Sequence, residues 1–217
     1  MTRGVRFFLV LGVGLLGLDA AILGLIMSRA LGAKPPAWTV VSSGTAAIGG
    51  PFTLVATDGT TVTTQTYRGK WMLIYFGYTF CPDACPTALT NMSIALQQLH
   101  RDADSIQPIF VTVDPNRDTA TVLGEYLKSF DPRIVGLTGS EEQIEAIVKT
   151  YRVYAKSRKD EGGDYLIDHS SYMYLMDLTG KFVDVIEGTT PPDQLADWLR
   201  KSIREHSACK ASNTCPT

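Results

Sequence analysis

Tyr75-Phe-Gly-Tyr-Thr-Phe-Cys81-Pro-Asp-Ala-Cys85-Pro86 is the most informative segment of this chain. The continuous apolar run Trp71–Phe76 is typical of a buried β-strand, and two thiols follow it with three residues between them. Residues four apart lie on one face of a helical turn, so both sulfurs can meet there. Because Pro82 and Pro86 lack backbone N–H groups, we expect a helix to begin at Pro86 and the thiols to lie in an irregular turn. The nearby helix dipole would then favour thiolate.

The pattern after the cysteines predicts an α/β fold. Apolar residues at helical spacing continue to Leu99, and 106–113 reads as a strand, so strand, helix and strand form a parallel crossover. Before this crossover, a hairpin is expected around Asp58-Gly59. After it, we expect a helix over 122–130, a strand over 134–137 and a helix that a capping-box pattern opens at Ser140. A hairpin of Tyr172–Met176 and 181–186 and a last helix from Pro191 through Ile203 complete the expected elements. A βαβ half followed by a ββα half is the order of the thioredoxin-like fold. In that order, the loop entering the final hairpin lies beside the cysteine turn, and His169 occupies that loop.

The expected meeting of Cys81, Cys85 and His169 indicates a site for a soft metal ion. Two thiolates and one imidazole suit Cu(I), whereas structural zinc normally takes four ligands. His100 ends a predicted helix and His206 lies near the C-terminus, so neither offers an equivalent fourth ligand. Copper is therefore the predicted metal and zinc the weaker alternative, while a pair of buried, inert cysteines would be the non-functional interpretation.

Three aspartates lie close to this predicted site. Asp114 and Asp118 follow the neighbouring strand, where they could tune copper or dock a partner, or where Asp114 could shape a turn and Asp118 or Thr119 could cap the next helix. Asp168 could orient the imidazole of His169 from the adjacent position, or be a turn residue.

Two further cysteines, Cys209 and Cys215, flank a short polar segment after the last predicted helix. In an oxidising compartment they would most simply form a local disulfide. A second metal site or a resolving thiol is the alternative, with His206 nearby.

An apolar run of about twenty residues, Phe7–Met27, is long enough to cross a bilayer core of roughly 30 Å. It is longer than a signal-peptide core, and Ser28-Arg29-Ala30 is a poor cleavage site, so an uncleaved transmembrane anchor is expected. Asp19 within the run is either an interface residue or a tolerated polar position. The formal net charge of −2 and the absence of any large Lys/Arg cluster argue against nucleic-acid binding.

The chain therefore divides into five expected parts. They are a cytoplasmic N-terminus (1–6), a transmembrane anchor (7–27), a linker containing Pro35-Pro36 (28–48), a thioredoxin-like copper-binding domain (49–205) and a cysteine-containing tail (206–217).

The motifs from Gly49 to Ile203 together resemble the Sco/SenC family of copper-binding proteins. They are Gly50-Pro51-Phe52, Gly69-Lys70, the cysteine stretch Tyr75–Pro86, Val113-Asp114-Pro-Asn-Arg-Asp118-Thr, Gly136-Leu-Thr-Gly139 and Asp168-His169-Ser-Ser-Tyr-Met-Tyr-Leu-Met-Asp177. The resemblance implies a membrane-anchored thioredoxin-like domain that binds copper through Cys81, Cys85 and His169 and helps to assemble the binuclear copper centre of cytochrome c oxidase. Ala84 replaces a larger aliphatic residue that the family often has, and the tail cysteines are outside the family pattern.

The leading interpretation is a metallochaperone rather than an enzyme, with the copper-receiving subunit of the oxidase as its partner and with the copper donor and the thiol reductant left unidentified. The alternative is a thiol–disulfide oxidoreductase that uses Cys81 and Cys85 to reduce cysteines of that subunit or of another periplasmic protein. A peroxidase is a third class, suggested faintly by Thr79, but it leaves His169 unexplained. Because the N-terminus lacks an Arg/Ser-rich presequence, the expected location is a bacterial inner membrane with the domain in the periplasm.

Overall fold

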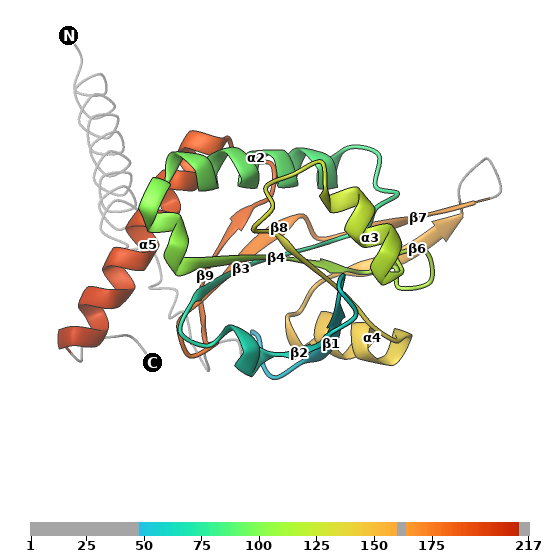
Figure 1. Cartoon of the computed structure of the whole chain (residues 1–217), viewed down its shortest axis with the longest axis horizontal. Coiled ribbons are helices and arrows are strands. Elements are labelled where there is room, and N and C mark those ends of the chain that lie inside the picture. Colours follow the sequence, from blue (N-terminus) through green and yellow to red (C-terminus); the bar gives the residue numbers. More distant parts are fainter. Residues whose placement is uncertain (1–47, 160–163, 213–217) are drawn as a thin grey trace, which may run out of the picture. The chain divides into compact units, whose positions relative to one another are not determined.

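The computed structural model describes residues 48–159 and 164–212. In this part of the chain, seven strands form one sheet in the order β2-β1-β5-β4-β3-β8-β9, and β6 and β7 form a separate two-stranded ribbon (Figure 1). The strands are β1 (Thr53–Ala56), β2 (Thr61–Thr63), β3 (Trp71–Gly77), β4 (Ile106–Thr112), β5 (Val135–Thr138), β6 (Ala155–Lys159), β7 (Tyr165–His169), β8 (Tyr172–Met176) and β9 (Phe182–Glu187). The helices are α2 (Ala84–Gln98), α3 (Ala120–Leu127), α4 (Glu141–Thr150) and α5 (Pro192–Ser212), with 3-10 helices η1 (Thr64–Tyr67) and η2 (His100–Ser105).

The central strand β3 carries the cysteine turn at its carboxyl end, and all seven of its residues are buried. It pairs in parallel with β4, with Tyr75 opposite Phe110, and antiparallel with β8, with Tyr75 opposite Met173. The predicted β3–α2–β4 crossover and β8–β9 hairpin are thus confirmed, and with α5 they give the thioredoxin-like order. A strand that is buried on both faces of a sheet needs a near-continuous apolar sequence, which Trp71–Phe76 supplies.

Successive residues of β3 point to opposite faces of the sheet and meet different helices. Tyr75 contacts Phe110, whose ring contacts Tyr126 in α3, whereas Phe76 contacts Tyr151, which directly follows α4. Accordingly, Figure 1 shows α2 and α3 on one side of the sheet and α4 on the other. The cysteine turn enters α2, so the site lies on the Tyr75 side.

Local sequence signals account for several element boundaries. The predicted Asp58-Gly59 turn joins β1 and β2, where Gly59 has φ +84°, a conformation that glycine adopts without strain. The predicted capping box also forms: the Ser140 hydroxyl accepts from the Gln143 N–H, and the Gln143 side chain accepts from the Ser140 N–H. α4 therefore begins where the sequence predicts.

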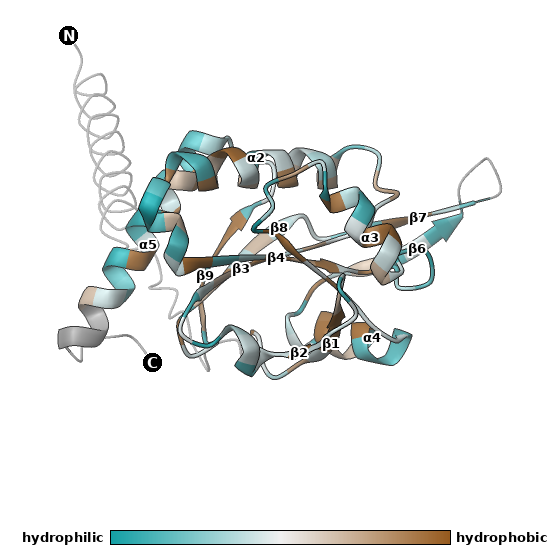
Figure 2. Ribbon diagram, viewed as in Figure 1, coloured by the Kyte–Doolittle hydropathy of each residue, from teal (hydrophilic) through white to brown (hydrophobic). Residues whose placement is uncertain are grey.

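The structure differs from the sequence-based predictions at several places. α2 begins at Ala84 rather than at Pro86, and α5 continues to Ser212, which makes part of the expected tail helical. His169 is not in a loop, because it ends strand β7 of the β6–β7 ribbon, which the sequence did not predict. Figure 2 shows why: β6 is hydrophilic, so it lacks the alternation that identifies a strand.

No helix in the described ranges is both long and apolar enough to cross a membrane. The predicted anchor Phe7–Met27 and its Asp19 lie outside the described residues, as does Cys215.

Candidate metal centre

Two sulfurs and one imidazole nitrogen meet beside the carboxyl end of β3. His169 Nε2 lies 3.3 Å from Cys85 Sγ and 4.0 Å from Cys81 Sγ. These three donor atoms all lie within 4.8 Å of one another, and they are the single group of this kind within the described residues. Three ligands at about 2.3 Å from one ion in a trigonal plane would lie about 4 Å apart, so the observed spacing fits one metal ion.

The first turn of α2 holds the two cysteines in this arrangement. The Cys85 N–H, which has no partner within the helix, donates to Cys81 Sγ at 3.4 Å. Pro86 is the third helical residue, where its missing N–H costs nothing because the first four N–H groups of a helix are unpaired anyway. This explains why the helix starts before Pro86 and includes Cys85.

The two thiols differ sharply in environment. Cys85 is buried, and burial raises the pKa of its thiol. Cys81 is partly exposed, and a hydrogen bond from the Cys85 side chain, opposed by desolvation and supported by the backbone N–H groups of Cys85 and Asp83, lowers its pKa to about 4. Cys81 is therefore a thiolate near neutral pH, with Cys85 as the protonated partner that stabilises it.

Gly77 provides the space that the Cys85 sulfur occupies. A Cβ atom at position 77 would lie 2.7 Å from Cys85 Sγ and 2.9 Å from the ring of Phe110. The last residue of β3 therefore has to be small for the buried sulfur to lie against the strand.

The His169 ring is oriented by the backbone and by two tyrosines. Its Nδ1 lies 3.1 Å from the Ser170 carbonyl oxygen, so Nδ1–H donates there and the Nε2 lone pair faces the sulfurs. The rings of Tyr75 and Tyr78 meet the imidazole edge to face, and the Tyr78 hydroxyl accepts from the Ile167 N–H at 3.1 Å. Both tyrosines thus restrain the imidazole.

Asp168 has a different contact from either alternative expected for it. Its carboxylate pairs with Arg158 at 2.8 Å on the surface of the ribbon, where both side chains are 54% exposed. The partner of the imidazole is instead the Ser170 carbonyl.

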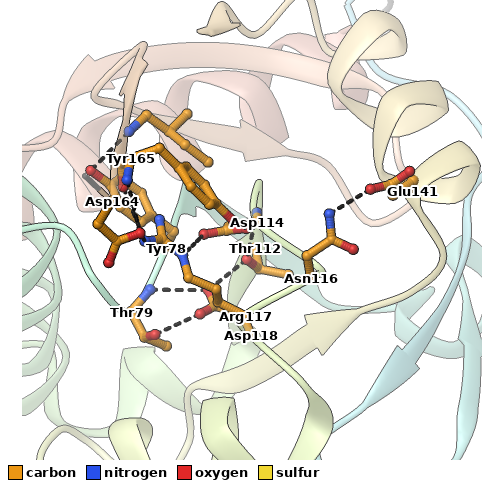
Figure 3. A network of polar contacts seen from close by, with 11 residues as sticks. Tyr78, Thr79, Thr112, Asp114, Asn116, Arg117, Asp118, Glu141, Asp164 and Tyr165 are labelled. Atoms are coloured by element: carbon orange, nitrogen blue, oxygen red, sulfur yellow. Dashed lines mark hydrogen bonds and ion pairs between the residues drawn. The ribbon is translucent and has the colours of Figure 1, made fainter. Parts of the chain in front are cut away.

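The structure places Asp118 beneath the cysteine turn. Its carboxylate is fully buried and accepts from the Thr79 N–H at 3.0 Å, from the Thr79 hydroxyl and from the Thr112 hydroxyl (Figure 3). Burial raises its pKa, and these hydrogen bonds oppose that shift. Asp118 therefore anchors the backbone two residues before Cys81, while Thr119 caps α3.

Asp114 faces the β6–β7 ribbon. It is buried, pairs with the Arg117 guanidinium and accepts from the Tyr165 hydroxyl at 2.7 Å (Figure 3). Sequence reasoning missed Tyr78, Arg117 and Tyr165. Arg117 belongs to the Asp114-Pro-Asn-Arg-Asp118 motif, which could have drawn attention to it. Its contact with Tyr165 could not be predicted, because the two residues are 48 positions apart.

The remaining histidines stand apart from the site. His100 is exposed, and His206 pairs with the buried Asp177 and meets Trp71 edge to face. Cys209 lies in α5, and the expected Cys209–Cys215 disulfide falls outside the described residues. The described part of the chain therefore offers no fourth ligand, and a site of two thiolates and one imidazole suits Cu(I) better than structural zinc, which takes four ligands.

Several known proteins are similar to this chain in sequence. Residues 40–204 match the SCO1/SenC family. The mitochondrial SCO1 homolog 1 of Arabidopsis thaliana is 43% identical over 166 residues, which are 76% of this chain and 50% of that protein. The SCO2-like protein of Rickettsia felis is 37% identical over 90% of this chain and 96% of its own length. The chain spans only about half of the length of several relatives: 50% and 57% of the two Arabidopsis SCO1 homologs and 58% of the sco1 protein of Schizosaccharomyces pombe.

Solved structures extend the similarity to the fold. Bradyrhizobium japonicum ScoI, determined with copper bound, is 44% identical with a TM-score of 0.67, over 72% of this chain and 99% of that one. BsSco, described as a member of the Sco family of cytochrome c oxidase assembly proteins with a disulfide switch, is 25% identical with a TM-score of 0.59, over 72% and 94%. From the match over residues 40–204 and these relatives, the chain belongs to the SCO1/SenC family.

Proposed function

We propose that this chain binds copper as Cu(I) through Cys81, Cys85 and His169 and delivers it to the copper-receiving subunit of cytochrome c oxidase. The observation that carries the proposal is the convergence of two sulfurs and one imidazole nitrogen within 4.8 Å, without a fourth ligand in the described ranges. Family membership supports the metal and the recipient, because copper is bound in the Bradyrhizobium protein and BsSco is described as an oxidase assembly protein.

Partial exposure of the site supports transfer rather than storage. Cys81 and His169 are both partly accessible, whereas Cys85 is buried. An incoming thiolate could therefore replace His169 or Cys81 first and Cys85 last, so that copper is never without ligands. A closed four-ligand site would hold the metal instead.

The proposal is tested by Cu(I) affinity, measured by competition with a chromophoric chelator on the reduced full chain and its His169→Ala variant. The affinity is expected to fall in this variant. His100→Asn is the matched control, because His100 is exposed, and asparagine tolerates its φ of +50°. Affinity that is unchanged in His169→Ala would contradict three-ligand copper binding.

The asymmetry of the two thiols favours a second candidate function, thiol–disulfide exchange. The Cys81 thiolate would attack a target disulfide and release one target thiolate. Cys85, after losing its proton, would attack the Cys81 sulfur, release the second target thiolate and leave a Cys81–Cys85 disulfide, which an external thiol reductant would have to reduce. His169 takes no part in these steps, so exchange is expected to survive His169→Ala while copper binding does not.

We further propose that residues 7–27 anchor the chain as a single span in a bacterial inner membrane, that 28–48 form a linker and that the domain over 49–205 faces the periplasm. The length and apolarity of Phe7–Met27 support the span. Protease added to spheroplasts should digest the domain, whereas protection of the domain until the membrane is lysed would contradict this orientation.

A further inference from the structure

Arg117 lies between the two segments that carry the proposed metal ligands. Its guanidinium carbon is 3.7 Å from the ring centroid of Tyr165 in the ribbon and 4.6 Å from that of Phe80, the neighbour of Cys81 in the cysteine turn. Its Nη1 donates to the Tyr165 carbonyl oxygen at 3.0 Å and meets Asp164 at 3.2 Å. The same side chain thus contacts both segments. Figure 3 shows Arg117 together with Asp164 and Tyr165 of the ribbon side.

The ribbon needs such contacts to hold its position. A two-stranded ribbon is at best marginally stable by itself, and β6 and β7 pair only with each other rather than with the main sheet. His169 ends β7, so movement of the ribbon moves the imidazole relative to the sulfurs. Besides Arg117, the Tyr165 hydroxyl bonds to Asp114, and the Tyr78 hydroxyl bonds to the Ile167 N–H.

We propose that Arg117 is a positioning residue that holds the β6–β7 ribbon against the cysteine turn and so sets the distance between His169 Nε2 and the two sulfurs. The inference rests on the proposed copper site. Arginine is suited to this position because its planar, forked group can stack on Tyr165 and Phe80 while it pairs with the buried Asp114. A lysine would keep the charge but lose the stacking and the fork.

A double-mutant cycle on the reduced full chain separates positioning from general support of the fold. Cu(I) affinity is measured by chelator competition for the wild type, Arg117→Met, His169→Ala and the double variant. If Arg117 acts through His169, Arg117→Met weakens binding by about 10- to 100-fold, the range for residues that orient a ligand, and has no further effect once His169 is absent. Arg158→Met is the matched control, because Arg158 pairs with Asp168 on the exposed face of the same ribbon, and it should leave the affinity unchanged.

A metal-free measurement separates this inference from the proposed function. In the reduced protein without copper, Arg117→Met should accelerate hydrogen exchange at the Ile167 amide, which bonds to Tyr78, while Arg158→Met should not. Should Arg117→Met unfold the chain, Arg117→Lys replaces it in both measurements, with effects in the same direction but smaller.

The outcomes lead to different conclusions. Three results would overturn the positioning role. They are a loss of Cu(I) affinity from Arg117→Met that is equal with and without His169, an unchanged affinity in both Arg117 variants, and an unchanged rate of hydrogen exchange at the Ile167 amide. Failure of the wild type to bind Cu(I), with exchange at Ile167 still faster in Arg117→Met, would instead overturn the proposed function and leave the bracing of the ribbon by Arg117 established.

Discussion

Gly77 leaves no room for a methyl group beside the Cys85 sulfur, so Gly77→Ala should disturb the site directly. The added Cβ would lie 2.7 Å from Sγ, whereas ordinary contact begins at 3.4 Å. The sulfur would have to move by the difference, about 0.7 Å, which exceeds the ~0.5 Å within which a binding constellation must be held. The ring of Phe110, at 2.9 Å from the same Cβ, blocks movement of the methyl group towards its side.

The expected cost has two parts. Overpacking of a buried site lowers the free energy of unfolding by about 1 to 3 kcal/mol. Displacement of Cys85 should also weaken Cu(I) binding, since Cys85 Sγ would no longer keep its 3.3 Å distance to His169 Nε2. The backbone at Gly77 is not in the left-handed region, so the effect comes from crowding rather than from conformation.

Urea unfolding of the metal-free protein measures the first part, and chelator competition measures the second. Gly124→Ala in α3 is the matched control, because its Cβ would meet nothing closer than 3.4 Å and alanine favours the helix by about 0.5 to 1 kcal/mol. Unchanged stability in Gly77→Ala would refute the crowding argument. Lower stability with unchanged Cu(I) affinity would show that Phe110, and not the sulfur, moves.

Three other changes test the environments around the site. The pKa of Cys81 is lowered to about 4. The rate at which iodoacetamide alkylates Cys81 in the reduced, metal-free protein should therefore be nearly constant from about pH 5 to 8 and should fall below about pH 4. A rate that rises tenfold per pH unit, as expected for an ordinary thiol of pKa ~8.5, would contradict the lowered pKa. Asp118→Asn should lower the free energy of unfolding, measured in urea, by about 1 to 3 kcal/mol, because the asparagine amide has one acceptor oxygen whereas the Thr79 and Thr112 donors use both oxygens of the carboxylate. Stability within ~0.5 kcal/mol of wild type would argue against the anchoring role. Ser140→Ala should lower it by about 1 kcal/mol through loss of the α4 cap, with Cu(I) affinity unchanged; a loss of affinity would mean that α4 influences the site.

Local sequence signals predicted the elements that depend on neighbouring residues. The apolar run Trp71–Phe76, the Asp58-Gly59 turn and the Ser140 capping box each specify a strand, a turn or a helix start through contacts within a few residues. The predicted start of α2 at Pro86 is wrong, because the N–H groups of the first and the third helical positions both lack partners within the helix, so a proline fits either position.

The β6–β7 ribbon is an element that local sequence patterns do not predict. β6 reads Ala-Lys-Ser-Arg-Lys over residues 155–159, and four of these five side chains are exposed, so no apolar alternation marks it as a strand. Its pairing with β7 provides the backbone hydrogen bonds that the side-chain pattern does not reveal. The prediction that His169 lies near the cysteines is therefore confirmed, but the prediction that it lies in a loop is wrong, because it ends strand β7.

The ligand types, the strand that ends at the cysteine turn and the thioredoxin-like order of elements can be predicted from the amino-acid sequence, because they follow from residue chemistry and short-range periodicity. The folded chain is needed to see how closely Cys81, Cys85 and His169 approach one another. It is also needed to see that Asp118 supports the cysteine turn and that Arg117 joins this turn to the ribbon. Cys85 and Cys81 are 84 and 88 residues away from His169 in sequence, so the distances between the sulfurs and the imidazole depend on sheet order and on side-chain packing between segments, which no local pattern encodes.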